Sequence, residues 1–324
     1  MDMFKQASKV YAENFKPIAW FGRCIFLSWY CDVGTCKFCY RSTIKDRIKH
    51  AKNARRSIPS IIVEALLAKH LGWRIEFLTG GYKIFPMKDL IKITKLVSDI
   101  YGEKIWLNLG ALEQEDLEKF KPYIEGIVSS IETIEPKLHE DICPNKPIQQ
   151  YIDMFNYSGN LKKSITIVIG LGEKPEHIDL LFKFIEKYEV ERITFYALKP
   201  ITGTPYTEGP ETKYYAEWVA KTRIKFPKLE IIAGITARRV DDVPWLIKAG
   251  ANAITKFPAT KKFNSDGAKQ IEKYIKQEGR EFLGTLTKLP NINWNKEIDK
   301  IDIDNETKQK TKDLLKDYLK KMSQ

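Results

Sequence analysis

The sequence lacks any apolar run long enough to cross a membrane, since no stretch approaches the roughly 18–20 residues that a transmembrane helix needs. Its first residues carry charges of both signs and do not include the apolar segment of a secretory signal. Low-complexity linkers are absent, and so are internal repeats beyond an alternation of strand-like and helix-like segments. We therefore expect a folded, cytoplasmic protein with no membrane partner.

An even set of cysteines is also lacking. The five present are Cys24, Cys31, Cys36, Cys39 and Cys143, and an odd number in a cytoplasmic chain argues against a disulfide framework. A metal-binding or catalytic role is favoured instead, because Cys31, Cys36 and Cys39 fall within nine residues of each other.

Acidic residues are fewer than basic ones: 42 Asp and Glu residues and 54 Lys and Arg residues give a net charge of +12. Such a balance can mark a nucleic-acid-binding protein. Here the excess is spread along lysine-rich helical segments, which is typical of a solvated surface, so nucleic acid is not expected. Basic clusters within residues 45–56 keep an anionic substrate or partner as the alternative. Hydrophobic residues make up 43% of the chain, enough for a sizeable core.

Short segments rich in Val, Ile, Phe and Trp alternate with amphipathic segments, which predicts strands alternating with helices. The expected strands are residues 23–29, 74–79, 105–109, 126–131, 164–169, 192–198, 229–235 and 252–256. The expected helices are residues 59–71, 87–101, 114–123, 148–157, 175–188, 211–226, 241–249 and 265–278. Eight such pairs predict an α/β fold with a parallel sheet closed into a (β/α)8 TIM-type barrel, and an open doubly wound sheet is the alternative. We expect the barrel to span residues 1–280, and residues 281–324 to form a helical extension with a helix at 306–322 outside the barrel.

The cysteine cluster directly follows the first expected strand, at the end of a barrel where active sites form. Three thiolates on one short loop can hold three corners of an iron–sulfur cube and leave the fourth iron open. Structural zinc, which takes four ligands, and a two-cysteine redox pair are the alternatives. For Cys24, inside the first strand, and Cys143, in a turn, a packing or surface role is favoured.

This pattern, with the aromatic Phe38 before the last cysteine, resembles the radical S-adenosylmethionine (SAM) superfamily. Most members have three residues between the first two cysteines, whereas this chain has four. The resemblance implies an enzyme with a [4Fe–4S] cluster on Cys31, Cys36 and Cys39. It also implies a low-potential electron donor and reductive cleavage of SAM to methionine and a 5′-deoxyadenosyl radical, which abstracts hydrogen from a small-molecule substrate.

Further motifs follow later strands in the order of this family. Gly80 and Gly81 resemble the family's Gly-Gly-Glu motif for the SAM amino group, although Tyr82 replaces the glutamate. The resemblance also implies that Glu132, in the segment from Ser130, binds the SAM ribose or ammonium, and that the backbone after the fifth strand packs on adenine. The implied SAM-contacting residues are therefore Phe38, Gly80, Gly81, Ser130, Glu132, Gly170 and Leu171.

Residues 125–260 resemble the biotin synthase-like subgroup, which includes the hydrogenase maturase HydE. Positions that carry auxiliary-cluster cysteines in biotin synthase are here Leu107, Ser130 and Ile165, which argues against sulfur insertion. An arginine that relatives use for the SAM carboxylate is replaced by Tyr151. Within the subgroup the chain is similar to the HmdB (HcgA) family, which implies biosynthesis of the pyridinol part of the [Fe]-hydrogenase iron-guanylylpyridinol cofactor.

Polar residues near the expected strand ends are the candidates for substrate binding. They are Asn108, Thr166, Tyr196, Lys199, Arg238 and Lys256, and barrel filling or surface ion pairing is the alternative for each. Of Arg238 and Arg239, we expect Arg238 to point into the lumen and to bind a carboxylate, either that of the substrate or that of SAM. Other functions kept open are a HydE-like or biotin synthase-like reaction on another small molecule, and a non-catalytic Fe–S or basic RNA-binding barrel.

Overall fold

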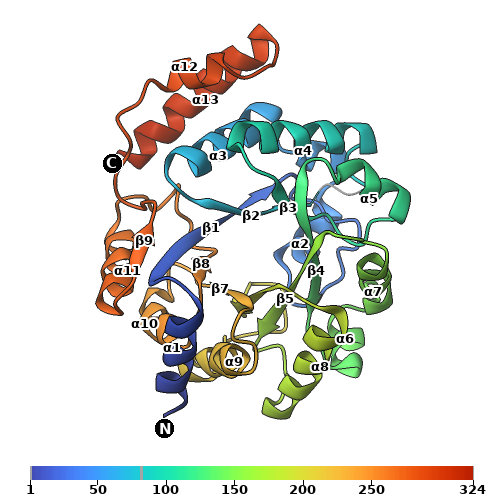
Figure 1. The fold of residues 1–324 in the computed structure, drawn as a ribbon. Helices are drawn as coiled ribbons and strands as arrows, with labels where there is room; N and C mark the ends of the chain where they lie inside the picture. The colour runs from blue at the N-terminus through green and yellow to red at the C-terminus, as the bar shows by residue number, and fades with distance from the viewer. Residues whose placement is uncertain (1, 81–82, 324) are drawn as a thin grey trace.

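The computed structural model describes residues 2–80 and 83–323, and its centre is a closed barrel of eight parallel strands (Figure 1). Neighbouring strands follow one another from β2 to β8, and β1 closes the ring by pairing with both β8 and β2. The strands are β1 (Ile18–Phe26), β2 (Arg74–Thr79), β3 (Ile105–Asn108), β4 (Ile124–Glu132), β5 (Lys162–Ile169), β6 (Arg192–Ala197), β7 (Glu230–Gly234) and β8 (Ala253–Thr255). The expected (β/α)8 barrel and its eight strands are confirmed, with β1 displaced toward the amino terminus.

An outer layer of helices covers the strands. The helices expected from the sequence are present as α3 (Ile58–His70), α4 (Met87–Tyr101), α5 (Gln114–Phe120), α7 (Ile148–Asn156), α8 (Ile178–Tyr188), α9 (Thr212–Lys225), α10 (Val243–Lys248), α11 (Asp266–Gln277) and α13 (Asn305–Met322). Short 3-10 helices occur at Lys45–Arg47, Ala51–Ala54, Pro175–His177 and Val240–Asp242. Helix α13 packs against α3, outside the barrel as expected.

Four helices and one strand were not expected from the sequence. They are α1 (Met3–Asn14), α2 (Tyr40–Ile44), α6 (Pro136–Ile142), α12 (Trp294–Asp299) and β9 (Glu281–Leu283). Helix α1 packs against α9 and α10, while α2 and α6 flank the loop that carries the clustered cysteines. Strand β9 pairs in parallel with residues 18–20 of β1, so the segment after residue 280 contributes to the sheet as well as to helices.

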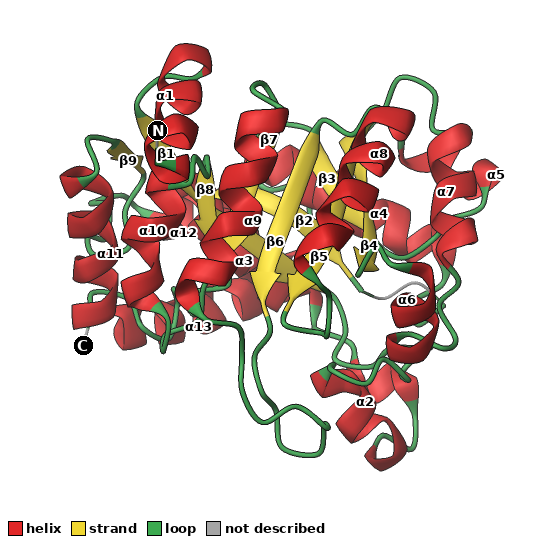
Figure 2. Cartoon of the chain, turned by 90° about the horizontal axis from the view of Figure 1, so that it is seen from below, coloured by secondary structure: helices red, strands yellow, loops and turns green. Residues whose placement is uncertain are grey.

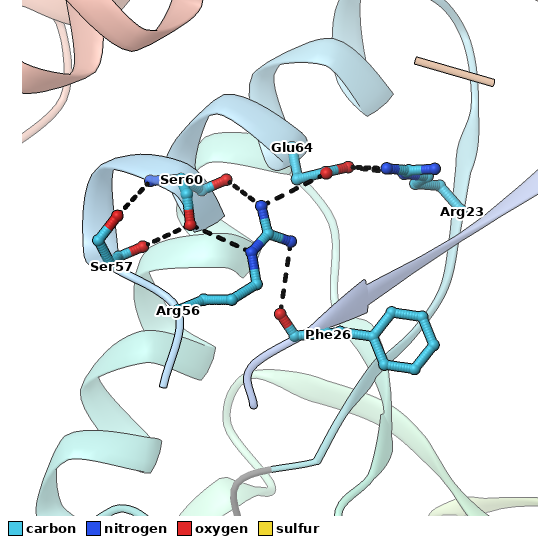
Figure 3. Close-up of polar contacts among 6 residues, drawn as sticks. All are labelled: Arg23, Phe26, Arg56, Ser57, Ser60 and Glu64. Carbon is cyan, nitrogen blue, oxygen red and sulfur yellow. Dashed lines mark hydrogen bonds and ion pairs between the residues drawn. The ribbon is translucent and has the colours of Figure 1, made fainter. Parts of the chain in front are cut away.

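A buried ion-pair network joins β1 to α3 (Figure 3). The Glu64 carboxylate is 2.5 Å from the Arg23 guanidinium and 3.4 Å from that of Arg56. The Arg56 guanidinium also donates to the carbonyl oxygen of Phe26, and its backbone N–H donates to that of Leu27. Because Phe26 ends β1, the network fixes the point at which the cysteine-bearing loop leaves the barrel.

A second buried carboxylate, Glu76 of β2, lies inside the barrel and is fully buried. It accepts hydrogen bonds from the Cys24 thiol at 2.9 Å, the Tyr196 hydroxyl at 2.7 Å, the Thr194 hydroxyl at 3.1 Å, and the Thr255 hydroxyl. These donors come from β1, β6 and β8, so one carboxylate connects strands from across the barrel. Four donors offset the cost of burying its charge.

The two ends of the barrel differ. Figure 2 shows β5 and β6 pointing toward the side where α2 and α6 lie, whereas α1 lies at the opposite end. This side is the carboxyl-terminal end of the strands, where TIM barrels form their active sites. No helix within residues 2–80 or 83–323 has the length and apolar character needed to span a bilayer.

Candidate active site

The clustered cysteines lie on the loop between β1 and α2, which is held by backbone contacts on both sides. Leu27 N–H donates to the carbonyl oxygen of Thr79 at the end of β2 at 2.8 Å. The Lys45 ammonium donates to the carbonyl oxygens of Asp32 and Val33, each at 2.9 Å. Gly34 has φ +54°, and a Cβ there would lie 2.9 Å from the Cys31 carbonyl oxygen, so this tight turn requires glycine.

Cys31, Cys36 and Cys39 are free thiols and half-buried. The Cys39 N–H donates to the carbonyl oxygen of Cys36 at 3.1 Å, which closes a turn between the second and third cysteines. Among the described residues, no three acidic, histidine or cysteine side chains are already gathered around a common point. The donor set nevertheless fits an iron–sulfur cluster with one open iron, because three thiols share one glycine-containing loop at the catalytic end of the barrel.

Cys143, at the end of α6, lies against this loop and is almost fully buried. Its thiol is hydrogen-bonded to the Cys36 sulfur, and this bond is the main cause of a lowered pKa at Cys36 and a raised pKa at Cys143. Burial instead raises the pKa of Cys39. The Lys37 N–H donates to the carbonyl oxygen of Ile142 at 2.9 Å, so backbone contacts also hold α6 against the loop. Of the two roles expected for Cys143, packing is confirmed and surface exposure is excluded.

Glu132 ends β4 with φ +68°, an uncommon backbone conformation for a residue with a side chain. Its carboxylate accepts a hydrogen bond from the buried Lys146 ammonium at 2.7 Å. Burial alone would lower the pKa of Lys146, but Glu132 and then Tyr151 outweigh it and hold this pKa well above its usual value. His139 fixes the Lys146 backbone, because its Nε2 lies 2.7 Å from the Lys146 carbonyl oxygen. The result is a preformed ion pair beside the cysteine loop.

The neighbouring strand ends carry two more of the expected SAM contacts. Ser130 and Asn108 exchange side-chain hydrogen bonds of 3.0 and 3.1 Å between β4 and β3. The Gly80 N–H donates to the Asn108 carbonyl oxygen, and Gly80 has φ +78°. The expected contact at Gly81 lies outside the described residues. These contacts bring Gly80, Asn108 and Ser130 to one side of the barrel mouth.

The turn after β5 is built around Glu173. Its carboxylate accepts hydrogen bonds from the Gly170 N–H at 2.8 Å and the Leu171 N–H at 2.9 Å. Burial raises the pKa of Glu173. A Cβ at Gly170 would lie 2.9 Å from the side chain of Pro210, so the turn has no room for a larger residue. The Leu171 side chain packs in a buried cluster with Cys143, and Phe38 lies at the edge of the same cluster. An internal carboxylate thus fixes this backbone next to the cysteine loop.

The candidate substrate contacts divide by exposure. Thr166 is buried and Tyr196 is half-buried at the barrel lumen, whereas Lys199 is exposed. Arg238 is exposed too, which differs from the enclosed, inward position expected for it. The reason is that β7 ends at Gly234 and the Arg239 N–H bonds back to the Thr236 carbonyl oxygen, so strand alternation does not extend to Arg238.

Sequence reasoning missed Lys146 and Glu76, both of which have buried side chains. For Glu76 a signal existed. It is a single acid within the apolar strand of residues 74–79, and strands of a parallel barrel are buried on both faces, so its side chain is expected to be buried. Lys146 stands in a polar segment between two helices and gives no such signal.

A cavity of about 1330 Å³ opens at the other end of the barrel, and Trp20, Trp73 and Trp106 contribute to its lining. The buried Arg192 guanidinium lies 3.7 Å from the centre of the Trp106 ring and closes the lumen from this side. None of the cysteines lies there. In TIM barrels this face serves stability, so we place the candidate site at the cysteine end.

Comparisons with known proteins agree with this placement. The family model described as the radical SAM superfamily matches residues 27–185, from the cysteine loop to α8. The chain is 38% identical over 301 residues to the uncharacterized protein MJ0597 of Methanocaldococcus jannaschii, covering 91% of this chain and 83% of that protein. It is 26% identical over 187 residues to a biotin synthase of Thermotoga petrophila, covering 55% and 61% of the two chains. Its fold is similar to that of methylornithine synthase (PylB), with a TM-score of 0.72, 18% identity, and coverage of 86% and 88%.

Proposed function

The chain belongs to the radical SAM superfamily and is an enzyme, and on this premise we propose that Cys31, Cys36 and Cys39 hold a [4Fe–4S] cluster at which SAM is cleaved. The observation that carries the proposal is the loop of three free thiols at the catalytic end of the barrel, beside the Glu132–Lys146 ion pair. When bound, the cluster supplies an electron that cleaves SAM to methionine and a 5′-deoxyadenosyl radical.

The chain's own residues would bind and orient SAM. We assign the SAM ribose or ammonium to the Glu132 carboxylate, and the SAM carboxylate to Lys146 in place of the arginine that is absent at Tyr151. A buried, charged ammonium next to the cysteine loop supports the second assignment. The Gly80 backbone and the turn at Gly170 and Leu171 complete the SAM site.

Glu132→Gln should weaken SAM binding about tenfold or more, because a charge-assisted hydrogen bond is replaced by a neutral one. The measurement is SAM affinity by equilibrium dialysis on anaerobically reconstituted protein, with iron content determined in parallel. Iron content should stay at the wild-type value. Glu140→Gln, an exposed substitution in α6, is the matched control. Unchanged SAM affinity and cleavage in Glu132→Gln would assign Glu132 a structural role only.

For the substrate, we propose a reaction in the biosynthesis of the pyridinol part of the [Fe]-hydrogenase cofactor, as in the HmdB family. The assignment is supported by a spacing between the first two cysteines that departs from the usual three residues, although it is four here and five in the HmdB family. The lack of auxiliary-cluster cysteines at Leu107, Ser130 and Ile165 argues against biotin synthase-type sulfur insertion.

Two measurements test these levels separately. Reconstituted protein with SAM and dithionite should form 5′-deoxyadenosine, and zinc or no metal in place of iron and sulfide would contradict the radical SAM assignment. In a host that makes [Fe]-hydrogenase but lacks its own HmdB gene, expression of this chain should restore the guanylylpyridinol cofactor. A Cys36→Ala variant should not restore it. If wild-type protein forms 5′-deoxyadenosine yet restores no cofactor, the pyridinol assignment is wrong and the enzyme class stands.

A further inference from the structure

Lys256, directly after β8, has a left-handed backbone with φ +68°. This conformation is unfavourable for a residue with a side chain, and it persists where the surroundings determine it. Both neighbours are fixed, since Thr255 is fully buried with its hydroxyl bonded to Glu76, and Phe257 is buried. Lys256 itself is exposed. Glycine would adopt this backbone without strain, so the position carries a lysine at a cost in stability.

The Lys256 ammonium lies over two aromatic rings at the barrel mouth. Its nitrogen is 4.6 Å from the ring centre of Tyr196 in β6 and 5.6 Å from that of Phe26 in β1. The Tyr196 hydroxyl is anchored to Glu76, and Phe26 is held by the Arg56 contact to its carbonyl oxygen. The ring faces attract the cation and orient it across the mouth.

No anionic side chain within the described residues neutralises this ammonium: none of their ion pairs or hydrogen bonds involves its nitrogen. Glu76, whose carboxylate accepts hydrogen bonds from four neutral donors, forms no ion pair or hydrogen bond with Lys256 among the described contacts. By contrast, Lys146 is paired with Glu132, and Arg239 with Asp242. Lys256 is therefore a cation fixed at the catalytic end of the barrel and open to an incoming anion.

We propose that Lys256 binds a carboxylate group of the small-molecule substrate, with Phe26 and Tyr196 forming the apolar side of that subsite. The inference rests on the proposed radical SAM function and names the substrate class for it. It moves the carboxylate contact from Arg238, on the loop after β7, to Lys256, whose ammonium lies over the rings of Phe26 and Tyr196. The competing anionic group is the carboxylate of SAM, which is assigned to Lys146.

The test uses sodium benzoate as the probe, because it combines a carboxylate with an aromatic ring, and benzamide as its neutral counterpart. Isothermal titration calorimetry on anaerobically reconstituted, SAM-loaded protein should detect benzoate binding that is weakened about tenfold or more in Lys256→Met. Benzamide binding should change little. Lys261→Met, which removes one charge from an exposed position nearby, should bind benzoate like wild type. Lys256→Gly should lose benzoate binding as Lys256→Met does, with a melting temperature no lower than that of wild type.

The outcomes separate this inference from the function on which it rests. Failure of wild-type protein to bind benzoate, or equal binding by Lys256→Met, would overturn the carboxylate subsite. Loss of SAM affinity in Lys256→Met would overturn it as well, since Lys256 would then hold SAM. In each case, formation of 5′-deoxyadenosine by wild-type protein with dithionite reports whether the radical SAM function itself holds.

Discussion

Replacing Cys31, Cys36 or Cys39 with alanine should remove the iron–sulfur chromophore and abolish SAM cleavage. A cluster with three protein thiolates loses one of its ligands in each variant. The measurements are visible absorbance, bound iron and sulfide, and 5′-deoxyadenosine formation after anaerobic reconstitution. The loss of activity should be complete within detection.

Cys24→Ala and Cys143→Ala are the matched controls, and both should keep the chromophore. Cys143→Ala is the sharper of the two because its thiol is hydrogen-bonded to the Cys36 sulfur. A Cys143→Ala protein without a cluster, alongside a Cys31→Ala protein that retains one, would show that the ligand assignment is wrong.

Glu76→Gln should destabilise the barrel by about 3 kcal/mol or more, because an amide cannot accept all four hydrogen bonds that the carboxylate accepts. Each buried donor left without a partner costs about 1–3 kcal/mol. For a chain of 324 residues we expect the melting temperature to fall by roughly 4–5 °C or more. Differential scanning calorimetry of the metal-free protein measures this shift.

Glu306→Gln provides the comparison, since Glu306 is an exposed acid in α13 paired with Lys310 on the same helix. Its melting temperature should stay within about 1–2 °C of wild type, as expected for a surface ion pair. If the melting temperature of Glu76→Gln equals that of Glu306→Gln, the four hydrogen bonds contribute little to stability.

The barrel could be predicted because buried parallel strands produce continuous apolar runs that alternate with amphipathic helices. The end of β1 could not be placed from the same signal, because Leu27 is as apolar as a strand residue yet lies beyond the last residue of β1, Phe26. Helix α6, of 7 residues, was not predicted, although α5 of the same length was.

Of the candidate site, the cysteine loop was recognisable from spacing alone, whereas the groups around it were not. Lys146 reaches Glu132 only because a turn after α6 folds back, with the Lys146 N–H donating to the Cys143 carbonyl oxygen. No local sequence pattern predicts that the chain turns back at this point. The inward position expected for Arg238 assumed that β7 continues farther than it does.

Strand β9 also bears on the order in which the chain can fold. Residues 18–20 of β1 pair with β9, whereas β8 pairs only with residues 20–22 and β2 begins its pairing at Gly22. During synthesis, this stretch of β1 therefore waits with unpaired backbone groups until residues 281–283 leave the ribosome. A nascent chain arrested before residue 280 would expose the unpaired backbone N–H and C=O groups of a strand edge to chaperones and to other chains. All eight barrel strands would already have been synthesised.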